Sequence, residues 1–67
     1  MKKVRMSEEL KRNLILNDCE DHVKEFGDCE GIIVGKVFED DEGIVDVRWQ
    51  PSGLKYMYDI QNLIVID

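Results

Sequence analysis

Three side chains in the first half of the chain belong to types that bind zinc. Cys19, His22 and Cys29 are separated by two and by six residues, and thiolate and imidazole are common zinc ligands. A structural zinc site has four ligands, usually supplied as two pairs, and the second pair is missing here. A neighbouring aspartate is the remaining way to complete such a site. We therefore expect both thiols to be reduced, with no metal or other cofactor bound.

The same histidine is the only imidazole available for catalysis. A nucleophile needs a base within hydrogen-bond reach and a third group that orients the base. Ser7 precedes the acidic start of a predicted helix and Ser52 lies in a predicted turn, so neither fits a nucleophile elbow. No glycine-rich phosphate loop occurs in the sequence. We therefore do not expect an enzyme.

Aromatic and acidic side chains offer a different chemistry, the binding of a positively charged partner. The candidate partner-binding residues are Trp49, Tyr56, Tyr58, Asp40, Asp41 and Glu42. Trp49 ends a predicted strand just before Pro51, where an indole can be half buried and still contact a ligand. Phe38 and one tyrosine face are expected to fill the core instead, because a small barrel needs large side chains.

Charge is unevenly distributed along the chain. The net charge is −6, but residues 1–12 contain five basic and two acidic side chains, which leaves −9 for residues 13–67. An acidic surface attracts cations and repels a phosphate backbone. Nucleic acid is therefore an unlikely partner, except through a short basic arm formed by Lys2, Lys3 and Arg5.

Length and hydrophobicity predict one small folded domain over residues 1–67. Hydrophobic residues make up 43% of the 67 positions, which is typical of globular chains. The longest apolar runs are far shorter than the ~18 residues of a membrane span, and no apolar signal segment follows the basic N-terminus. We therefore expect a cytoplasmic protein that does not associate with membranes.

Residues 7–27 are predicted to form two short helices in series. Ser7 can cap the first helix and Asp18 the second. Glu8 can pair with Arg12 along the first helix. Gly27 is expected to end the second helix in a left-handed conformation.

Residues 30–67 read as short strands separated by turns. The run 31–39 is rich in β-branched residues, and Gly35 inside it predicts a bulge or bend. An acidic turn over 40–43, with Gly43 in a left-handed conformation, leads into the alternating run 44–50. The alternation predicts a core of Ile32, Val34, Val45, Val47, Leu63 and Val65, joined by Leu10 or Leu14.

The predicted fold is mainly β: a five-stranded SH3-like barrel with a helical insertion after the first strand and a 3₁₀ turn before the last. The string GIIVGKVFEDDEGIVDVRWQPSGLKYMYDIQNLIVI within residues 30–66 resembles small SH3-like, Tudor-like and KOW-type barrels, most of all the Mind bomb-type SH3 repeat. The strings EFGDCEGIIVG and DVRWQPSGLKYMY resemble short uncharacterised bacteriophage and prophage proteins. These resemblances imply a fold and a source rather than an activity.

Together these features predict a small non-enzymatic protein-interaction module, an adaptor or inhibitor, that binds a basic segment of a protein partner. If the phage resemblance is sound, that partner is a host or phage protein. The alternative is a nucleic-acid-associated module, either an acidic DNA mimic or a weak binder through the basic N-terminal arm. A zinc-stabilised domain is the third possibility.

Overall fold

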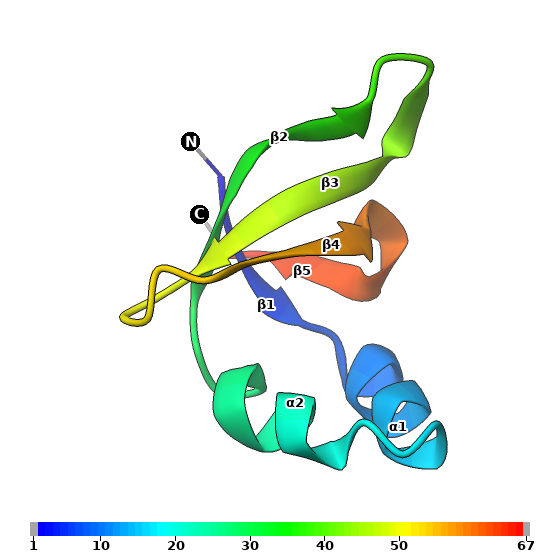
Figure 1. Cartoon of the computed structure of the whole chain (residues 1–67), viewed down its shortest axis with the longest axis vertical. Coiled ribbons are helices and arrows are strands. Elements are labelled where there is room, and N and C mark those ends of the chain that lie inside the picture. Colours follow the sequence, from blue (N-terminus) through cyan, green and yellow to red (C-terminus); the bar gives the residue numbers. More distant parts are fainter. Residues whose placement is uncertain (1, 67) are drawn as a thin grey trace.

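The computed structural model describes residues 2–66 as one five-stranded antiparallel sheet with two short helices (Figure 1). In chain order the elements are β1 (Lys3–Met6), α1 (Glu8–Leu16), α2 (Glu20–Phe26), β2 (Gly31–Phe38), β3 (Asp41–Trp49), β4 (Lys55–Asp59), the 3₁₀ helix η1 (Ile60–Asn62) and β5 (Leu63–Val65). The sheet order is β4-β3-β2-β1-β5. The mainly-β class, the helical insertion after the first strand and the 3₁₀ turn before the last are confirmed. The closed barrel is not: the sheet is open, with β4 and β5 as its edges.

The first helix begins as its sequence predicts. The Ser7 hydroxyl accepts a hydrogen bond from the Leu10 N–H at 3.0 Å, which satisfies one of the free donors of the first turn. Glu8 pairs with Lys11 at 3.3 Å, one residue earlier than the expected partner Arg12. Leu10 is the buried residue of this helix.

The junction between the helices differs from the expectation. Asp18 has φ of 62° and ends α1: its N–H donates to the Ile15 carbonyl, and the Cys19 N–H donates to the Leu14 carbonyl at 2.7 Å. This pair of bonds is a Schellman motif, which requires a left-handed residue at the position of Asp18. Asp18 therefore does not cap α2, whose N-cap is Cys19 without a side-chain bond. Gly27 is not left-handed, with φ of −59°.

The β2–β3 hairpin is longer than predicted. The pairing shifts between Ile33 and Gly35, so the expected irregularity near Gly35 is confirmed. The turn consists of residues 39–40 alone, and Gly43 lies inside β3 without a left-handed conformation. An Asp41 side-chain oxygen accepts the Gly43 N–H at 2.8 Å. The expected four-residue turn is therefore wrong.

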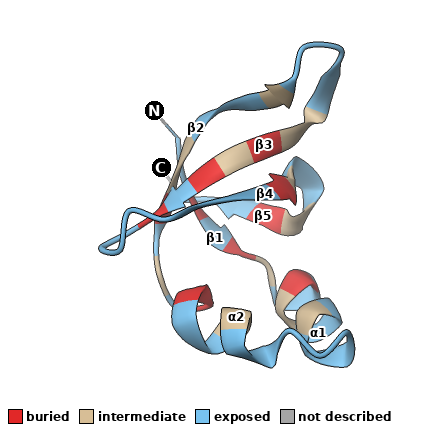
Figure 2. Cartoon of the chain, viewed as in Figure 1, coloured by how far each residue is buried: buried red, intermediate tan, exposed pale blue. Residues whose placement is uncertain are grey.

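The core lies between the sheet and the two helices (Figure 2). Its buried residues are Val4, Met6, Leu10, Phe26, Val45, Val47, Trp49, Tyr58 and Leu63. The predicted inward positions Val45, Val47, Leu63 and Leu10 are confirmed. Val34, Val65 and Phe38 are instead 41%, 47% and 55% exposed, and Ile32 is only partly buried.

Gly31 explains why the expected face of β2 was wrong. It lies opposite Trp49, and a Cβ at this position would be 2.4 Å from Val47 Cγ1 and 2.8 Å from Trp49 Cε3. Gly31 therefore faces the core and leaves room for the indole. Because neighbouring residues of a strand point to opposite faces, Ile32 is directed outward and Ile33 inward.

None of the helices formed by residues 2–66 has the length and apolar character needed to cross a membrane.

Candidate interaction groove

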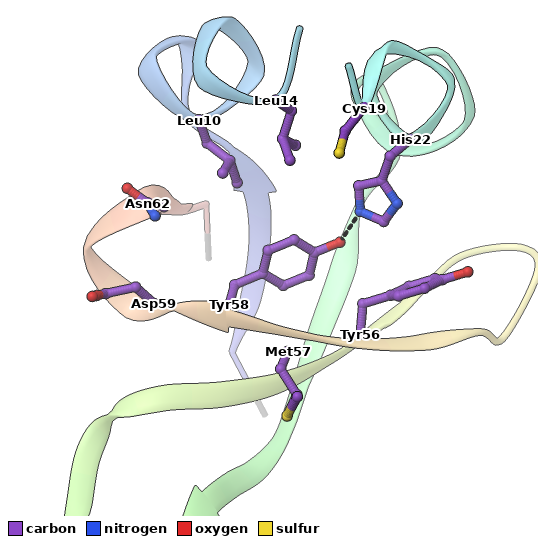
Figure 3. A pocket seen from close by; sticks show the side chains of 9 residues that line it. All are labelled: Leu10, Leu14, Cys19, His22, Tyr56, Met57, Tyr58, Asp59 and Asn62. Atoms are coloured by element: carbon purple, nitrogen blue, oxygen red, sulfur yellow. Dashed lines mark hydrogen bonds between the residues drawn. The ribbon is translucent and has the colours of Figure 1, made fainter. Parts of the chain in front are cut away.

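An apolar groove of about 520 Å³ lies between the two helices and the segment β4–η1 (Figure 3). Its lining residues are Leu10, Leu14, Cys19, His22, Tyr56, Met57, Tyr58, Asp59 and Asn62. The helices supply the aliphatic and imidazole side, while the strand supplies the two tyrosines. We call this feature the groove below.

The alternation of β4 decides which side chains face the groove. Tyr56 and Tyr58 are two residues apart, so both point toward the helices. Figure 3 shows the Met57 side chain on the opposite side of the strand, although the residue borders the groove. Pairing with β3 places Tyr58 opposite Val45 and Tyr56 opposite Val47.

The Tyr58 hydroxyl is the polar centre of the groove wall. The Trp49 Nε1–H donates to it at 2.9 Å, and His22 Nε2 forms a hydrogen bond with it from α2. Trp49 is fully buried and Tyr58 is 8% exposed. A buried N–H or hydroxyl without a partner is costly, so this three-residue chain allows polar atoms inside the core and attaches α2 to the sheet.

Burial determines the protonation states of Tyr58 and His22 in this hydrogen-bonded group. Burial, with a smaller contribution from the nearby Tyr56, raises the pKa of Tyr58 to about 12, against the lowering effect of the hydrogen bond from Trp49. Burial also lowers the pKa of His22, and Glu25 opposes this effect. At neutral pH the phenol is therefore protonated and the imidazole uncharged. Because Trp49 can only donate, the Tyr58 hydroxyl accepts from the indole and donates to His22 Nε2.

Aromatic rings extend this cluster toward the surface. Phe26 stacks on Trp49 with ring centroids 5.9 Å apart, and His22 meets Tyr56 edge to face at 4.8 Å. Tyr56 is 41% exposed. Its ring is therefore held by neighbours on one side and accessible on the other.

The structure separates the six residues predicted to bind a partner. Tyr56 and Tyr58 line the groove, but Trp49 lies beneath it with no exposed surface. Its predicted half-exposed position at the rim is wrong, because Gly31 provides space for the ring inside the core. Asp40, Asp41 and Glu42 lie at the tip of the β2–β3 hairpin, which Figure 1 shows at the opposite end of the molecule from the helices.

This separation also corrects the expected layout of charge. The sequence grouped the acidic residues Asp40, Asp41 and Glu42 with the aromatic residues as one partner-binding set. The tip of the β2–β3 hairpin projects beyond the rest of the sheet (Figure 1). Of the insertion and the acidic hairpin tip, only the insertion therefore borders the groove. The acidic side chain that does line the groove is Asp59, at the end of β4.

Sequence reasoning missed His22 and Asp59 as groove residues. His22 and Phe26 are four residues apart and so share a helix face, a spacing that indicates an inward position for the imidazole. Asp59 precedes η1 and accepts the Gln61 N–H at 2.9 Å. A carboxylate that caps a turn at a strand end is a local signal available in the sequence.

The candidate zinc ligands do not form a site. Within residues 2–66 the structure contains no cluster of three metal-ligating side chains. Cys19 is an exposed free thiol, while Cys29 is a partly buried one that packs against the core. Their sulfur atoms contact the backbone carbonyls of Asn17 and Glu25 respectively.

No family model, curated protein or solved structure matches the chain. Any assignment of function therefore depends on the geometry and charge of the groove.

Proposed function

We propose that this protein is a non-enzymatic interaction module that binds a basic segment of a protein partner in the groove. The observation that carries the proposal is an apolar groove of about 520 Å³ with the carboxylate of Asp59 on one side and the exposed ring of Tyr56 on the other. An Arg or Lys side chain is complementary to such a groove, because it has an apolar stem that ends in a positive charge.

The apolar wall supports the binding of such a stem. Leu10 and Leu14 face the ring of Tyr58 across the groove (Figure 3). The Tyr58 hydroxyl is already bonded to Trp49 and His22, so it presents its ring rather than a free polar group. An aliphatic stem in this position removes apolar surface from water on both sides.

The charged end of the ligand is favoured at two places. Asp59 uses one oxygen for its turn, and its other oxygen can accept from a guanidinium or ammonium group. The ring of Tyr56 can receive a cation on its exposed face. Residues 18–28, which include α2, contain five carboxylates and one lysine, so the field on the helix side also favours a cation.

We also infer that the chain is a variant of the SH3-like class. Three features support this: the sheet order β5-β1-β2-β3-β4, the insertion between the first two strands, and the 3₁₀ helix before the last strand. The resemblance to SH3-like barrels implies a peptide site where the segment after the first strand meets the loop after the second; the groove borders the first of these segments but not the β2–β3 turn. The adaptor or inhibitor role, the phage source and the cytoplasmic location stay predictions.

A nuclear magnetic resonance titration tests the proposal. A peptide of alternating Arg and Leu is added to the ¹⁵N-labelled protein, and we expect saturable shifts at Leu10, Leu14 and Tyr56. A peptide with every Arg replaced by Glu is the control ligand. Asp59→Asn keeps the acceptor for the Gln61 N–H but removes the charge, so we expect it to weaken binding several-fold.

The matched control is Asp40→Asn, which makes the same charge change in the distant β2–β3 turn. It should leave the affinity unchanged. Shifts confined to residues 39–42, or an equal response to the Glu peptide, would contradict binding in the groove.

A further inference from the structure

The outer face of the sheet carries a row of cations that the sequence does not reveal. The strand register aligns Lys3 with Ile32, Ile32 with Arg48, and Arg48 with Lys55. These pairs follow each other across β1, β2, β3 and β4, so three cations, Lys3, Arg48 and Lys55, lie in one line with Ile32 between the first two. We call this line, with the adjacent Arg5, the basic row.

Burial shows that the row faces away from the helices. On β1, Val4 and Met6 are buried while Lys3 and Arg5 are exposed. On β3, Arg48 is exposed between two buried neighbours. Lys55 is exposed and lies one position before the inward Tyr56. Alternation therefore directs all four cations to the face opposite the core.

The row is poorly compensated by negative charge. Of the four cations, Arg5 alone forms an ion pair with another residue of the range 2–66. Its partner is Glu30 at 3.8 Å, and both side chains are 48% exposed. An exposed pair of this kind is weak. Asp46, two residues before Arg48 on the same face of β3, is a further carboxylate on this face. Arg48 and Lys55 lie directly opposite each other, an arrangement that costs stability in a sheet.

The acidic remainder of the protein does not cancel this local field. The shortest dimension of the molecule is 19 Å, whereas charge is screened over about 8 Å at physiological ionic strength. The carboxylates of the helices lie on the other side of the core. An anion approaching the outer face therefore meets mainly the basic row.

The spacing of the row fits a nucleic-acid backbone. Neighbouring strands are about 4.8 Å apart, so the three steps from Lys3 to Lys55 span about 14 Å. A duplex strand carries one phosphate per ~3.4 Å of axis, which places about four phosphates along this length. An extended acidic peptide presents side chains to one face only every ~6.6 Å. The row itself has no aromatic side chain on which an unpaired base could stack, in contrast to typical single-strand sites.

We propose that the outer face of the sheet binds the phosphate backbone of duplex nucleic acid through Lys3, Arg5, Arg48 and Lys55, without sequence preference. This surface is separate from the groove, and it extends the basic N-terminal arm onto β3 and β4. Net charge alone disfavours such a partner. The register reverses that expectation because it concentrates four of the nine basic residues in one place.

Fluorescence anisotropy with a labelled DNA duplex tests the proposal. Four phosphate contacts predict that affinity falls about 100-fold between 50 and 200 mM salt. The double variant Arg48→Gln with Lys55→Gln should weaken binding at low salt and reduce the slope of log K against log salt by about 2. Thermal unfolding of the same variant should show an unchanged or higher midpoint, because the like-charged pair is removed.

The control Lys24→Gln with Lys36→Gln has the same net charge but changes basic residues outside the row. It should retain most of the affinity and the full salt slope. Equal weakening by both double variants would overturn the proposal, since net charge and not the row would then be responsible. Equal binding of polyglutamate, or a marked preference for single-stranded DNA, would also overturn it. Asp59→Asn should leave duplex binding unchanged, which separates this test from that of the groove.

Discussion

The inner and outer faces of the same sheet differ in burial and in charge. On the inner face Val47, Trp49 and Tyr58 are buried, and no buried side-chain nitrogen or oxygen among residues 2–66 lacks a hydrogen-bond partner. On the outer face Arg48 and Lys55 lie opposite each other and exposed, with no ion pair to another described residue. Only the inner face contributes substantially to folding. The outer face is therefore free to carry charge that a binding partner can use.

The largest expected difference is between a buried aromatic residue of the inner face and an exposed aromatic residue of the β2–β3 hairpin. Trp49→Ala removes a fully buried ring and should cost about 3–5 kcal/mol. A domain of this size has only about 3–10 kcal/mol in total. We therefore expect the variant to be largely unfolded at room temperature by circular dichroism. Phe38→Ala, at a position 55% exposed on the hairpin, should change the free energy of unfolding by less than ~1 kcal/mol. Similar losses in urea titrations of both variants would contradict this comparison.

Two glycines of β2 give the next contrast. Gly31→Ala places a methyl group against Val47 and Trp49 and should destabilise the fold by about 1–3 kcal/mol. Gly35→Ala has no neighbour within 4 Å and lacks a positive φ, so it should be neutral or slightly stabilising. Urea denaturation of both variants measures the difference. Equal effects would mean that Gly31 does not face the core.

These glycines also show how far the sequence could predict the fold. The strand boundaries, the Ser7 cap and the inward face of β3 follow from local patterns, because alternation and capping depend on nearby residues. The inward face of β2 cannot be predicted in this way, because both faces of this strand carry β-branched residues. Only the space that the Trp49 ring requires determines which face is directed toward the core. The indole of Trp49 also explains the wrong prediction at the candidate site. A tryptophan at the end of a strand lies at the rim or in the core depending on which residue lies opposite it, and the sequence alone does not show that residue.

The candidate groove could be predicted only in part. Tyr56 and Tyr58 are recognisable from the alternation of β4, but their meeting with His22 depends on how the helices pack against the sheet. The acidic turn was assigned to the same site because charge is visible in the sequence while hairpin direction is not. Likewise, the basic row is dispersed over residues 3–55 and becomes visible only through strand register.

An effect of similar size is expected from the Tyr58 hydroxyl, which joins α2 to the sheet. Tyr58→Phe leaves the buried Trp49 N–H without its acceptor and should cost about 1–3 kcal/mol. Tyr56→Phe is the matched control on the same strand, because none of the hydrogen bonds among residues 2–66 uses its hydroxyl. It should change the free energy of unfolding very little. Equal destabilisation by the two variants in urea would show that the Tyr58 hydroxyl is not the link.

The smallest expected effect is a pH dependence that belongs to the inner face alone. Burial holds the pKa of His22 below its ordinary value of 6.5, so the unfolded chain binds this proton more readily than the folded one. The free energy of unfolding should therefore fall as pH decreases from about 7 through 6.5 and toward the lowered pKa. The imidazole is neutral above this window and accepts from Tyr58; once protonated, it can no longer accept that bond.

Glu25 opposes the shift, so Glu25→Gln should steepen the loss. His22→Gln should abolish the slope between pH 7 and 6 while leaving the response of the carboxylates at lower pH. An unchanged slope in His22→Gln, measured by urea denaturation at each pH, would show that the imidazole is not buried against Tyr58.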